Sequence, residues 1–295
     1  MVFSGMTTPS YPPARPWVSN GSTTLCENPL WDGSALYWTD IPTGRIHRKS
    51  WESDALPEVF EGGAQVGGFT FQRDGSLLLF RETDIAILRP GESPSVLLGF
   101  EDAGSTRFND VIADPRGRVF AGTIGRNRES GGLFRVDTDG RITRVAGGTG
   151  CSNGLGFSPG LDFLYWACST RRRIFRFPYD EASGKLGEAA VFFEAGEDDG
   201  TPDGLTLDRE GNLYSVRWAA RQHGLLVLDP QGKVIHRHPV AARATTSAVF
   251  CGPDLRSLAI TAANLDDDPH RAADLFLMEP MPIAGRAEFR SAIGL

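Results

Sequence analysis

The sequence contains few cysteines and no strongly basic segment, and these absences argue against several classes of protein. Four cysteines are spread over 295 residues without a CxxC pair: Cys26, Cys151, Cys168 and Cys251. Their spacing predicts buried reduced thiols rather than a disulfide framework. The formal net charge is -7, and the longest basic run is the arginine triplet at residues 171–173. Nucleic acid and anionic membranes are therefore not expected as partners.

The sequence also lacks an export signal and a membrane span. Residues 1–17 show no charged start followed by an apolar core, so a cytoplasmic location is predicted. No apolar run approaches the roughly 18 residues needed to cross a bilayer. The glycine pairs at residues 62–63 and 67–68 lack the helix that a phosphate-binding loop requires, so they are interpreted as tight turns.

Six similar segments recur along the chain, each after a turn signal. They are GSALYWTD, GSLLLFRE, GRVFAGTI, LDFLYWAC, GNLYSVRW and LRSLAITA. The equivalent anchors are Leu36, Leu77, Val119, Phe163, Leu213 and Leu258, spaced by 41, 42, 44, 50 and 45 residues. Spacings of about 40 to 50 residues are typical of propeller blades. A second apolar run follows each segment, and almost no stretch has the pattern of an amphipathic helix.

This period predicts an all-β fold, a six-bladed β-propeller with a central channel. We expect residues 1–295 to form a single propeller domain, with about residues 1–18 as an N-terminal extension. The alternative, a pair of β-sandwiches, is disfavoured by the regular period. Radial repetition leaves only short, protected strand edges.

A side-chain oxygen recurs at one place in the repeat. Ten residues before the anchors stand Gly67, Asn109, Asn153, Asp203 and Ala248, and Glu27 stands nine residues before Leu36. The first strand of every blade lines the channel, so the four oxygen-bearing side chains are expected to converge. Two carboxylates and two amides, without histidine or cysteine, suit calcium, and magnesium or manganese would also fit.

The alternative is that these residues only shape similar turns, since Asn and Asp are ordinary turn residues. Glutamate fits a turn poorly, and two carboxylates in one narrow channel repel each other unless a cation compensates them. Asp203 is flanked by Pro202 and Gly204, which we expect to set the angle at which the chain enters its strand. Asp198 and Asp199, just upstream, are expected to be solvated bystanders.

Five segments carry a resemblance to a known family: CENPLWDGSALYWTDI, RFNDVIADPRGRVFAGT, CSNGLGFSP, TPDGLTLDREGNLY and, more weakly, TTSAVFCGPDLRSLAITAA. In this order they resemble the gluconolactonase and regucalcin (senescence marker protein) family of six-bladed propellers. The resemblance implies that Glu27, Asn153 and Asp203 bind one divalent cation. It also implies that Asn109 lies beside the metal, contacting substrate or metal-bound water, and that Arg107 helps to hold the substrate.

The chain departs from this family after the FAGT segment. Some relatives place an acidic substrate contact there, whereas this chain reads IGRNRESGG, with Asn127 near that point and Glu129 a little later. The family is associated with calcium, zinc and iron, and calcium is the expected metal here.

The remaining candidates receive structural interpretations. Trp38, Trp166 and Trp218 are expected in the core, although Arg217 and Trp218 would reach the pocket if the chain bends outward. Cys26 and Cys151 adjoin proposed ligands and are expected to be spectators. His47, His223, His236, His238 and His270 show no metal-like or triad-like spacing, and His223 is kept as a candidate for the channel mouth.

The function expected is a metal-dependent hydrolase that opens a lactone, a sugar 1,5-lactone or 1,4-lactone. The cation would polarise the carbonyl group, with Asp203 as general base or, equally compatible, a metal-bound water as nucleophile. One alternative is an organophosphate or aryl-ester hydrolase on the same metal site. The other is a non-catalytic propeller that binds calcium or a protein.

Overall fold

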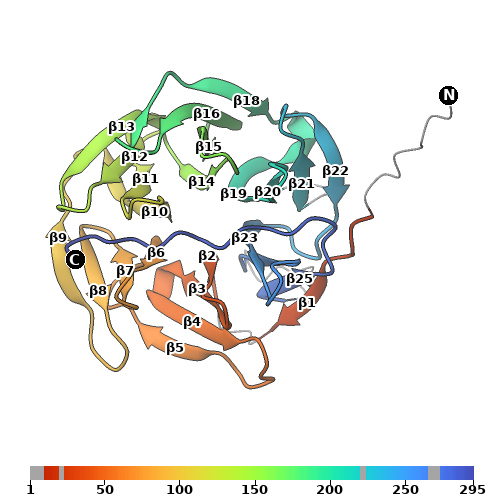
Figure 1. Cartoon of the computed structure of the whole chain (residues 1–295), viewed down its shortest axis with the longest axis horizontal. Coiled ribbons are helices and arrows are strands. Elements are labelled where there is room, and N and C mark those ends of the chain that lie inside the picture. The colour runs from red at the N-terminus through yellow and green to blue at the C-terminus, as the bar shows by residue number, and fades with distance from the viewer. Residues whose placement is uncertain (1–9, 20–22, 220–223, 265–272) are drawn as a thin grey trace.

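Short apolar runs separated by glycine and aspartate turns become strands, and these strands form a ring of six antiparallel sheets around a central axis (Figure 1). The computed structural model describes residues 10–19, 23–219, 224–264 and 273–295. This ring confirms the predicted all-β, six-bladed propeller. Within the described residues, no helix is long and apolar enough to span a membrane.

Each sheet runs outward from the channel in sequence order. The first contains β2 (Cys26–Trp31), β3 (Ala35–Asp40), β4 (Arg45–Ser50) and β5 (Glu58–Glu61). The second contains β6 (Gly68–Phe71), β7 (Leu77–Phe80), β8 (Asp84–Leu88) and β9 (Ser95–Gly99). The third contains β10 (Ser105–Ala113), β11 (Val119–Gly125), β12 (Gly131–Val136) and β13 (Ile142–Thr149).

The second half of the ring repeats this order. The fourth sheet contains β14 (Ser152–Phe157), β15 (Phe163–Cys168), β16 (Arg173–Asp180) and β18 (Ala190–Glu194), with β17 (Lys185–Leu186) beside the end of β16. The fifth contains β19 (Thr201–Leu207), β20 (Leu213–Trp218), β21 (Leu225–Leu228) and β22 (Val234–His238). The sixth contains β23 (Thr245–Cys251), β24 (Ser257–Ala262), β25 (Leu275–Met278) and β1 (Arg15–Val18). Two single-turn 3-10 helices are η1 (Ile41–Thr43) and η2 (Glu197–Asp199).

The ring is closed by a strand from the other end of the chain. β1 pairs antiparallel with β25 through Arg15↔Leu277 and Val18↔Leu275, so it becomes the outer strand of the sixth sheet. Residues 15–18, expected as part of an extension, thus belong to the ring.

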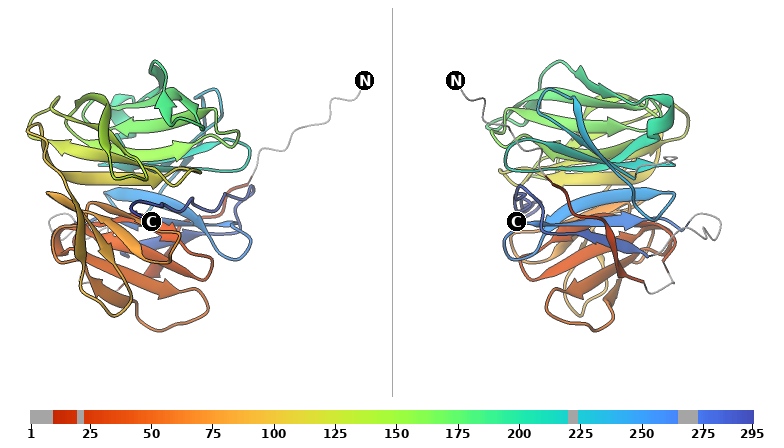
Figure 2. Two further views of the ribbon diagram at one scale, coloured as in Figure 1. Left: turned by 60° about the vertical axis from the view of Figure 1, so that its left-hand side comes forward. Right: turned by 90° about the vertical axis from the view of Figure 1, so that its right-hand side faces the viewer.

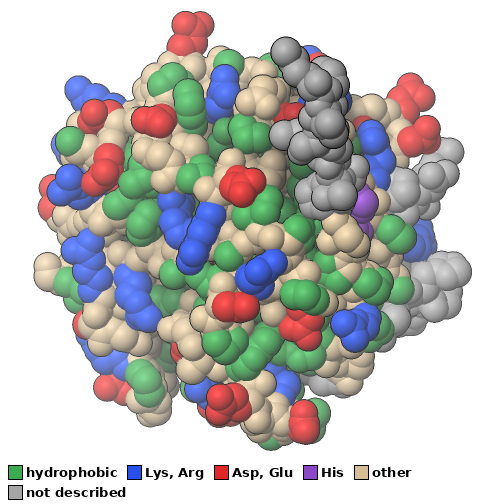
Figure 3. All heavy atoms as spheres, turned by 45° about the vertical axis from the view of Figure 1, so that its right-hand side comes forward, with side chains coloured by type: hydrophobic (Ala, Val, Ile, Leu, Met, Phe, Trp, Pro, Cys, Tyr) green, Lys and Arg blue, Asp and Glu red, His purple; other side chains and the backbone are tan. Residues whose placement is uncertain are grey.

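The core consists of six apolar clusters, each lying between two neighbouring sheets. Trp38 and Trp166 are buried in two of them, as expected. On the face seen in Figure 3, acidic and basic side chains are interspersed.

The position of the channel residue is the same in all six sheets. In each sheet, one residue of the inner strand pairs with the anchor of the second strand, which is β3, β7, β11, β15, β20 or β24. The channel residue lies four residues before this inner-strand residue. The anchor pairs are Trp31↔Leu36, Phe71↔Leu77, Ala113↔Val119, Phe157↔Leu164, Leu207↔Leu213 and Phe250↔Leu258. The channel residues are therefore Glu27, Gly67, Asn109, Asn153, Asp203 and Thr246.

This register corrects two details of the sequence alignment. The fourth anchor is Leu164 rather than Phe163, and the sixth channel residue is Thr246 rather than Ala248. The reason is the length of the turn between the inner strand and the second strand: seven residues separate Phe250 from Leu258 and six separate Phe157 from Leu164, against four or five in the other sheets. A fixed count back from the anchor does not allow for these differences.

After β25 the chain crosses one face of the ring, and we call residues 279–295 the strap. Figure 1 shows this segment passing across the channel, and Figure 2 places it on one face of the ring. Backbone bridges join it to the ends of inner strands, at Asp208↔Gly285 and Gln72↔Ser291. The strap therefore covers the channel mouth at which the inner strands end.

We predict that deleting residues 1–18 lowers the thermal midpoint by roughly 5 °C or more, because β25 loses its outer partner β1 and Val18 leaves the core. Differential scanning calorimetry measures the shift. Deletion of residues 1–9 alone leaves β1 whole and is the matched control. An equal midpoint for the two deletions would show that β1 does not hold the ring closed.

Candidate functional site

The five site residues expected from the sequence line one pocket of about 230 Å³: Glu27, Arg107, Asn109, Asn153 and Asp203. They come from β2, β10, β14 and β19, which belong to four different sheets. These residues stand near the beginnings of their strands, so the pocket opens at the mouth away from the strap. Residues spread over positions 27 to 203 of the sequence are thus brought together by the ring.

The two asparagines form a continuous hydrogen-bond network with Arg107. Asn109 Nδ2 donates to Asn153 Oδ1 at 2.6 Å and to the Ser152 carbonyl at 2.8 Å. Arg107 Nη1 donates to Asn109 Oδ1 at 2.6 Å, which fixes the orientation of that amide. Asn153 Nδ2 donates to Ser169 Oγ at 2.7 Å. Both amides are therefore held in place, since satisfied buried polar networks are rigid.

The carboxylates are less well compensated. Glu27 and Asp203 are each only 4% exposed. Glu27 Oε2 accepts one hydrogen bond, from the Asn28 N–H at 3.1 Å, while Asp203 Oδ1 is buried without any partner. A buried acceptor without a partner costs free energy, so the unpartnered Asp203 Oδ1 is available to accept a hydrogen bond or to bind a cation.

The pKa values of both carboxyl groups are raised well above their ordinary range. Burial is the largest cause for each. For Glu27 the charges of Asp110 and Asp203 add to it, and for Asp203 the charge of Asp110 does the same. Arg107 opposes the rise at both sites. The pocket thus disfavours the ionised forms of Glu27 and Asp203, and a bound cation would favour them.

Asp110 is a member of this cluster that the sequence analysis missed. It is buried, and desolvation raises its pKa to about 7. It follows Asn109 within the bulge of β10, where two consecutive residues stand opposite one partner residue. The RFND segment contained the signal, but strict alternation along a strand would have turned Asp110 away from the channel.

Cys151 and Trp218 also line the pocket. Cys151 was expected to be a spectator, yet it lies two residues before Asn153 and therefore on the same face of the chain, and Asn153 Nδ2 stands 3.4 Å from its sulfur. Burial raises the pKa of this thiol to about 12, so it is protonated at neutral pH. Cys26 packs in the core between the first and sixth sheets. All four cysteines are free thiols, as predicted.

Arg217 and Asp199 lie near the pocket and have structural roles. Arg217 is fully buried and donates from Nε to the Asp199 carbonyl at 2.8 Å, so it supports the pocket wall and does not line it. The Asp199 side chain accepts the Gly196 N–H at 3.0 Å, which corrects the expectation of a bystander. Asp198 is exposed, as expected.

The segment at residues 150–154 has the G-x-S-x-G spacing found in many serine hydrolases, but its geometry is different. Ser152 lies in the strand β14 and is buried, not at a strand-to-helix turn. Its hydroxyl accepts the Trp166 Nε1–H at 2.6 Å. The three histidines within the described residues, His47, His236 and His238, do not line the pocket, and His223 and His270 lie outside those residues. A serine nucleophile is therefore not supported.

The donor set fits a hard divalent cation. Buried carboxylates and amide oxygens within the same pocket are the ligands that calcium and similar ions bind. The unpartnered Asp203 Oδ1 supports this fit. Among the described residues, no three His, Cys, Asp or Glu side chains form a metal cluster, so amide ligands would have to complete the set.

The fold and this pocket define the chain as a six-bladed β-propeller with an oxygen-lined channel mouth. It belongs to the SMP-30/gluconolactonase/LRE-like family, whose model matches residues 25–264. The family expected from the sequence is therefore confirmed.

Two curated relatives and one solved structure illustrate the similarity. Pentonolactonase XacC of Haloferax volcanii is 38% identical over 297 residues, covering 94% of this chain and 98% of that protein. The 6-deoxy-6-sulfogluconolactonase of Pseudomonas putida is 32% identical, covering 85% of this chain and 88% of that protein. The structure of regucalcin from Agrobacterium tumefaciens, described as a calcium-binding protein, matches with a TM-score of 0.83 at 25% identity, over 94% of this chain and 97% of that one. The lactonase names confirm the expected enzyme class.

We predict that Glu27→Gln stabilises the metal-free protein at pH 8, because it removes a buried, repelled charge. The folded-state pKa of Glu27 is raised above its unfolded value of about 4.3, so the folded state holds more protons and its stability falls as pH rises through that interval. The variant should lose less stability between pH 4 and pH 8, measured by thermal melts in chelator.

Glu92→Gln, at an exposed position, is the matched control and should follow the wild type. Added calcium should raise the wild-type midpoint at pH 8 and have little effect on Glu27→Gln. Parallel stability–pH curves for the wild type and Glu27→Gln would contradict the electrostatic interpretation.

Proposed function

We propose that this chain is a metal-dependent hydrolase that opens the lactone ring of a sugar acid, with one divalent cation, most suitably calcium, held by Glu27, Asn153 and Asp203. The observation that carries the proposal is the convergence of two uncompensated carboxylates and two amides in one pocket with Arg107. Relatives named pentonolactonase and 6-deoxy-6-sulfogluconolactonase support the lactone as substrate class.

The pocket volume limits the size of the substrate. About 230 Å³ is below the roughly 300–1,000 Å³ of sites for drug-sized ligands, so it suits a single sugar ring. Its wall combines the polar site residues with the apolar side chains of Leu25, Ile41, Ile124 and Trp218. Such a wall provides contacts for both the hydroxyl groups and the C–H faces of a sugar lactone.

Each polar residue has a defined task in this proposal. When bound, the cation supplies positive charge that polarises the lactone carbonyl and stabilises the negative charge that develops on its oxygen. Asp203 Oδ1, which has no hydrogen-bond partner, accepts the proton of the attacking water as general base. Arg107 orients Asn109 and presents its remaining N–H groups to the substrate.

The loop after β11, which contains Asn127 and Glu129, is where a contact that selects the sugar would be expected. Asn127 and Glu129, which stand where some relatives have an acidic substrate contact, are exposed and do not line the pocket. Asn127 Oδ1 instead accepts the Glu129 N–H at 3.0 Å within their own loop. Ile124 forms this part of the wall, so we infer that the substrate presents a less polar edge to it.

We predict that Asp203→Asn reduces lactone turnover about a hundredfold or more at saturating metal, because the amide keeps the size of the side chain but loses its basicity. Asp198→Asn, on the exposed turn nearby, should change turnover less than about twofold. Acid release from gluconolactone and from a five-carbon lactone, followed with a pH indicator, measures both. Near-normal turnover by Asp203→Asn would exclude the base assignment.

We further predict that Arg107→Ala lowers kcat/KM for the lactone about tenfold or more while calcium affinity stays nearly unchanged. An arginine repels a cation and acts here through a charged hydrogen bond to Asn109 and through the substrate. Calorimetric titration with calcium separates the two effects. A loss of calcium binding as severe as in Glu27→Gln would show that Arg107 organises the metal site instead. Paraoxon in the same assay tests the organophosphate alternative.

A further inference from the structure

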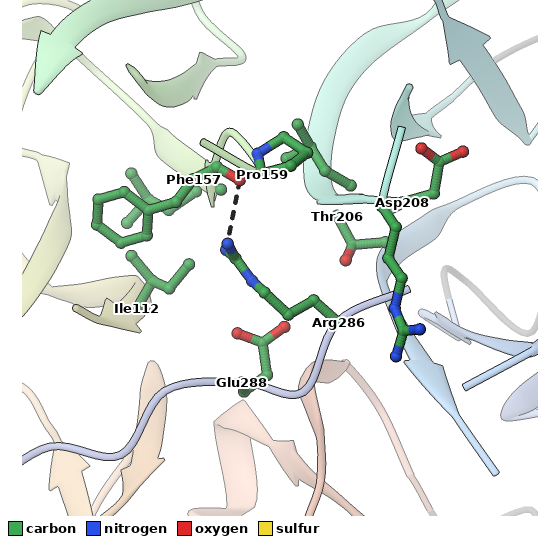
Figure 4. A pocket seen from close by; sticks show the side chains of 11 residues that line it. Ile112, Phe157, Pro159, Thr206, Asp208, Arg286 and Glu288 are labelled. Atoms are coloured by element: carbon green, nitrogen blue, oxygen red, sulfur yellow. Dashed lines mark hydrogen bonds between the residues drawn. The ribbon is translucent and has the colours of Figure 1, made fainter. Parts of the chain in front are cut away.

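The strap lines a second pocket at the opposite end of the channel. This pocket has a volume of about 200 Å³ and lies between the strap and the ends of β10, β14 and β19 (Figure 4). It shares no lining residue with the pocket that contains Asp203. Thr206 lines it three residues after Asp203, which corresponds to a separation of about 10 Å along β19. We call it the strap pocket.

Two side chains of opposite charge project from the strap into this pocket without forming an ion pair. Figure 4 shows Arg286 and Glu288 side by side above the strap backbone. Neither residue takes part in a salt bridge within the described parts of the chain. Arg286 donates only long hydrogen bonds, of 3.4 Å to the Phe157 carbonyl and 3.5 Å to the Ser158 carbonyl.

Burial makes this arrangement unfavourable in the absence of a ligand. Desolvation lowers the pKa of Arg286 and raises the pKa of Glu288, and the attraction between the two charges offsets only part of each shift. The Arg286 guanidinium lies over the ring of Phe289 at 4.7 Å, which holds its plane while leaving N–H groups available. A ligand that accepts from Arg286 and donates to Glu288 would satisfy both.

The other lining groups narrow the chemistry of that ligand. Arg209 is a second guanidinium at the edge of the pocket, and it uses its Nε–H on the Gly285 carbonyl at 2.9 Å. Thr206 contributes a hydroxyl, and Ile112 and Phe157 contribute an apolar floor. Asp208 also lines the pocket, but its two carboxylate oxygens already accept hydrogen bonds, from the Asn212 N–H at 2.9 Å and from the Tyr214 hydroxyl at 3.1 Å. Two guanidinium groups favour a carboxylate, because their N–H groups match its two oxygens. The Glu288 carboxyl group and the Thr206 hydroxyl lie in the same pocket and can exchange hydrogen bonds with hydroxyl groups of the same ligand.

We propose that the strap pocket binds a small polyhydroxy carboxylate, with its carboxylate on Arg286 and Arg209 and its hydroxyl groups on Glu288 and Thr206. The inference stands on the charges of this pocket and does not depend on the proposed lactonase activity. Glu288 also lines the narrow space in the middle of the channel, of about 40 Å³, which Asp110 lines from the other side. The strap pocket and the acidic cluster are therefore neighbours along one channel.

Hydrogen–deuterium exchange with D-gluconate as probe tests the proposal on the full chain. Gluconate should slow amide exchange in the strap around residues 283–289 and in residues 205–209, at the end of β19. The slowing should saturate as the gluconate concentration rises. D-glucitol, which lacks the carboxylate, and acetate, which lacks the hydroxyl groups, should each be at least about tenfold weaker. The measurements are repeated in the Asp203→Asn variant to separate this effect from binding at the other mouth.

Arg286→Gln should weaken the protection by gluconate about tenfold or more, because a charged hydrogen bond is lost. Glu288→Gln should reduce the preference for gluconate over acetate. Arg290→Gln is the matched control: Arg290 is also in the strap, lies over Phe71 at 5.4 Å and donates over 3.5 Å to the Gln72 carbonyl, but it is outside the strap pocket. Thermal melts establish that each variant is folded, and Arg209→Gln replaces Arg286→Gln if that variant unfolds.

Equal protection by acetate, or protection that survives both Arg286→Gln and Arg209→Gln, would overturn the proposal. Protection confined to residues around Glu27, Asn153 and Ser169 would also overturn it, while leaving the lactonase proposal intact. Conversely, strap protection in a chain that hydrolyses no lactone would support this pocket and count only against the proposed enzyme function.

Discussion

Closure of the ring is the constraint on which the rest of the structure depends. The pairing of β1 with β25 joins the two ends of the chain into one sheet and leaves no sheet open along the ring. Glu27, Asn109, Asn153 and Asp203 come from four sheets, and their distances are set by the packing of apolar clusters between blades. A site of this kind cannot exist in a single blade. Its geometry is a property of the closed ring.

The inner strands add a second requirement, which is close approach at the axis. A Cβ at Gly67 would lie 2.0 Å from the Phe108 carbonyl, and one at Gly204 would lie 2.2 Å from Ser247 Oγ. Glycine is therefore needed where neighbouring inner strands meet. The same crowding excludes water from Glu27, Asp110 and Asp203 and raises their pKa values. The channel thus holds carboxylates at a cost that a bound cation would offset.

The two channel mouths differ because the chain ends on one of them. The strap is held across the ends of the inner strands by hydrogen bonds, among them Ser291 N to the Phe71 carbonyl at 2.9 Å and Ile293 N to Gln72 Oε1 at 2.9 Å. It crosses the mouth away from the acidic pocket and contributes Arg286 and Glu288 to the pocket there. The same strands β10, β14 and β19 consequently line two pockets of different charge.

The sequence by itself determined the repeat, and with it the six blades and four of the oxygen donors, because spacing and apolar pattern are local properties that survive in one dimension. The predicted residues Glu27, Arg107, Asn109, Asn153 and Asp203 do line one pocket. Only the tertiary structure decided the rest. The bulge in β10 turned Asp110 inward, and the path of the strap placed Arg286 and Glu288 over the channel. Both depend on pairings between distant segments, which no local pattern encodes.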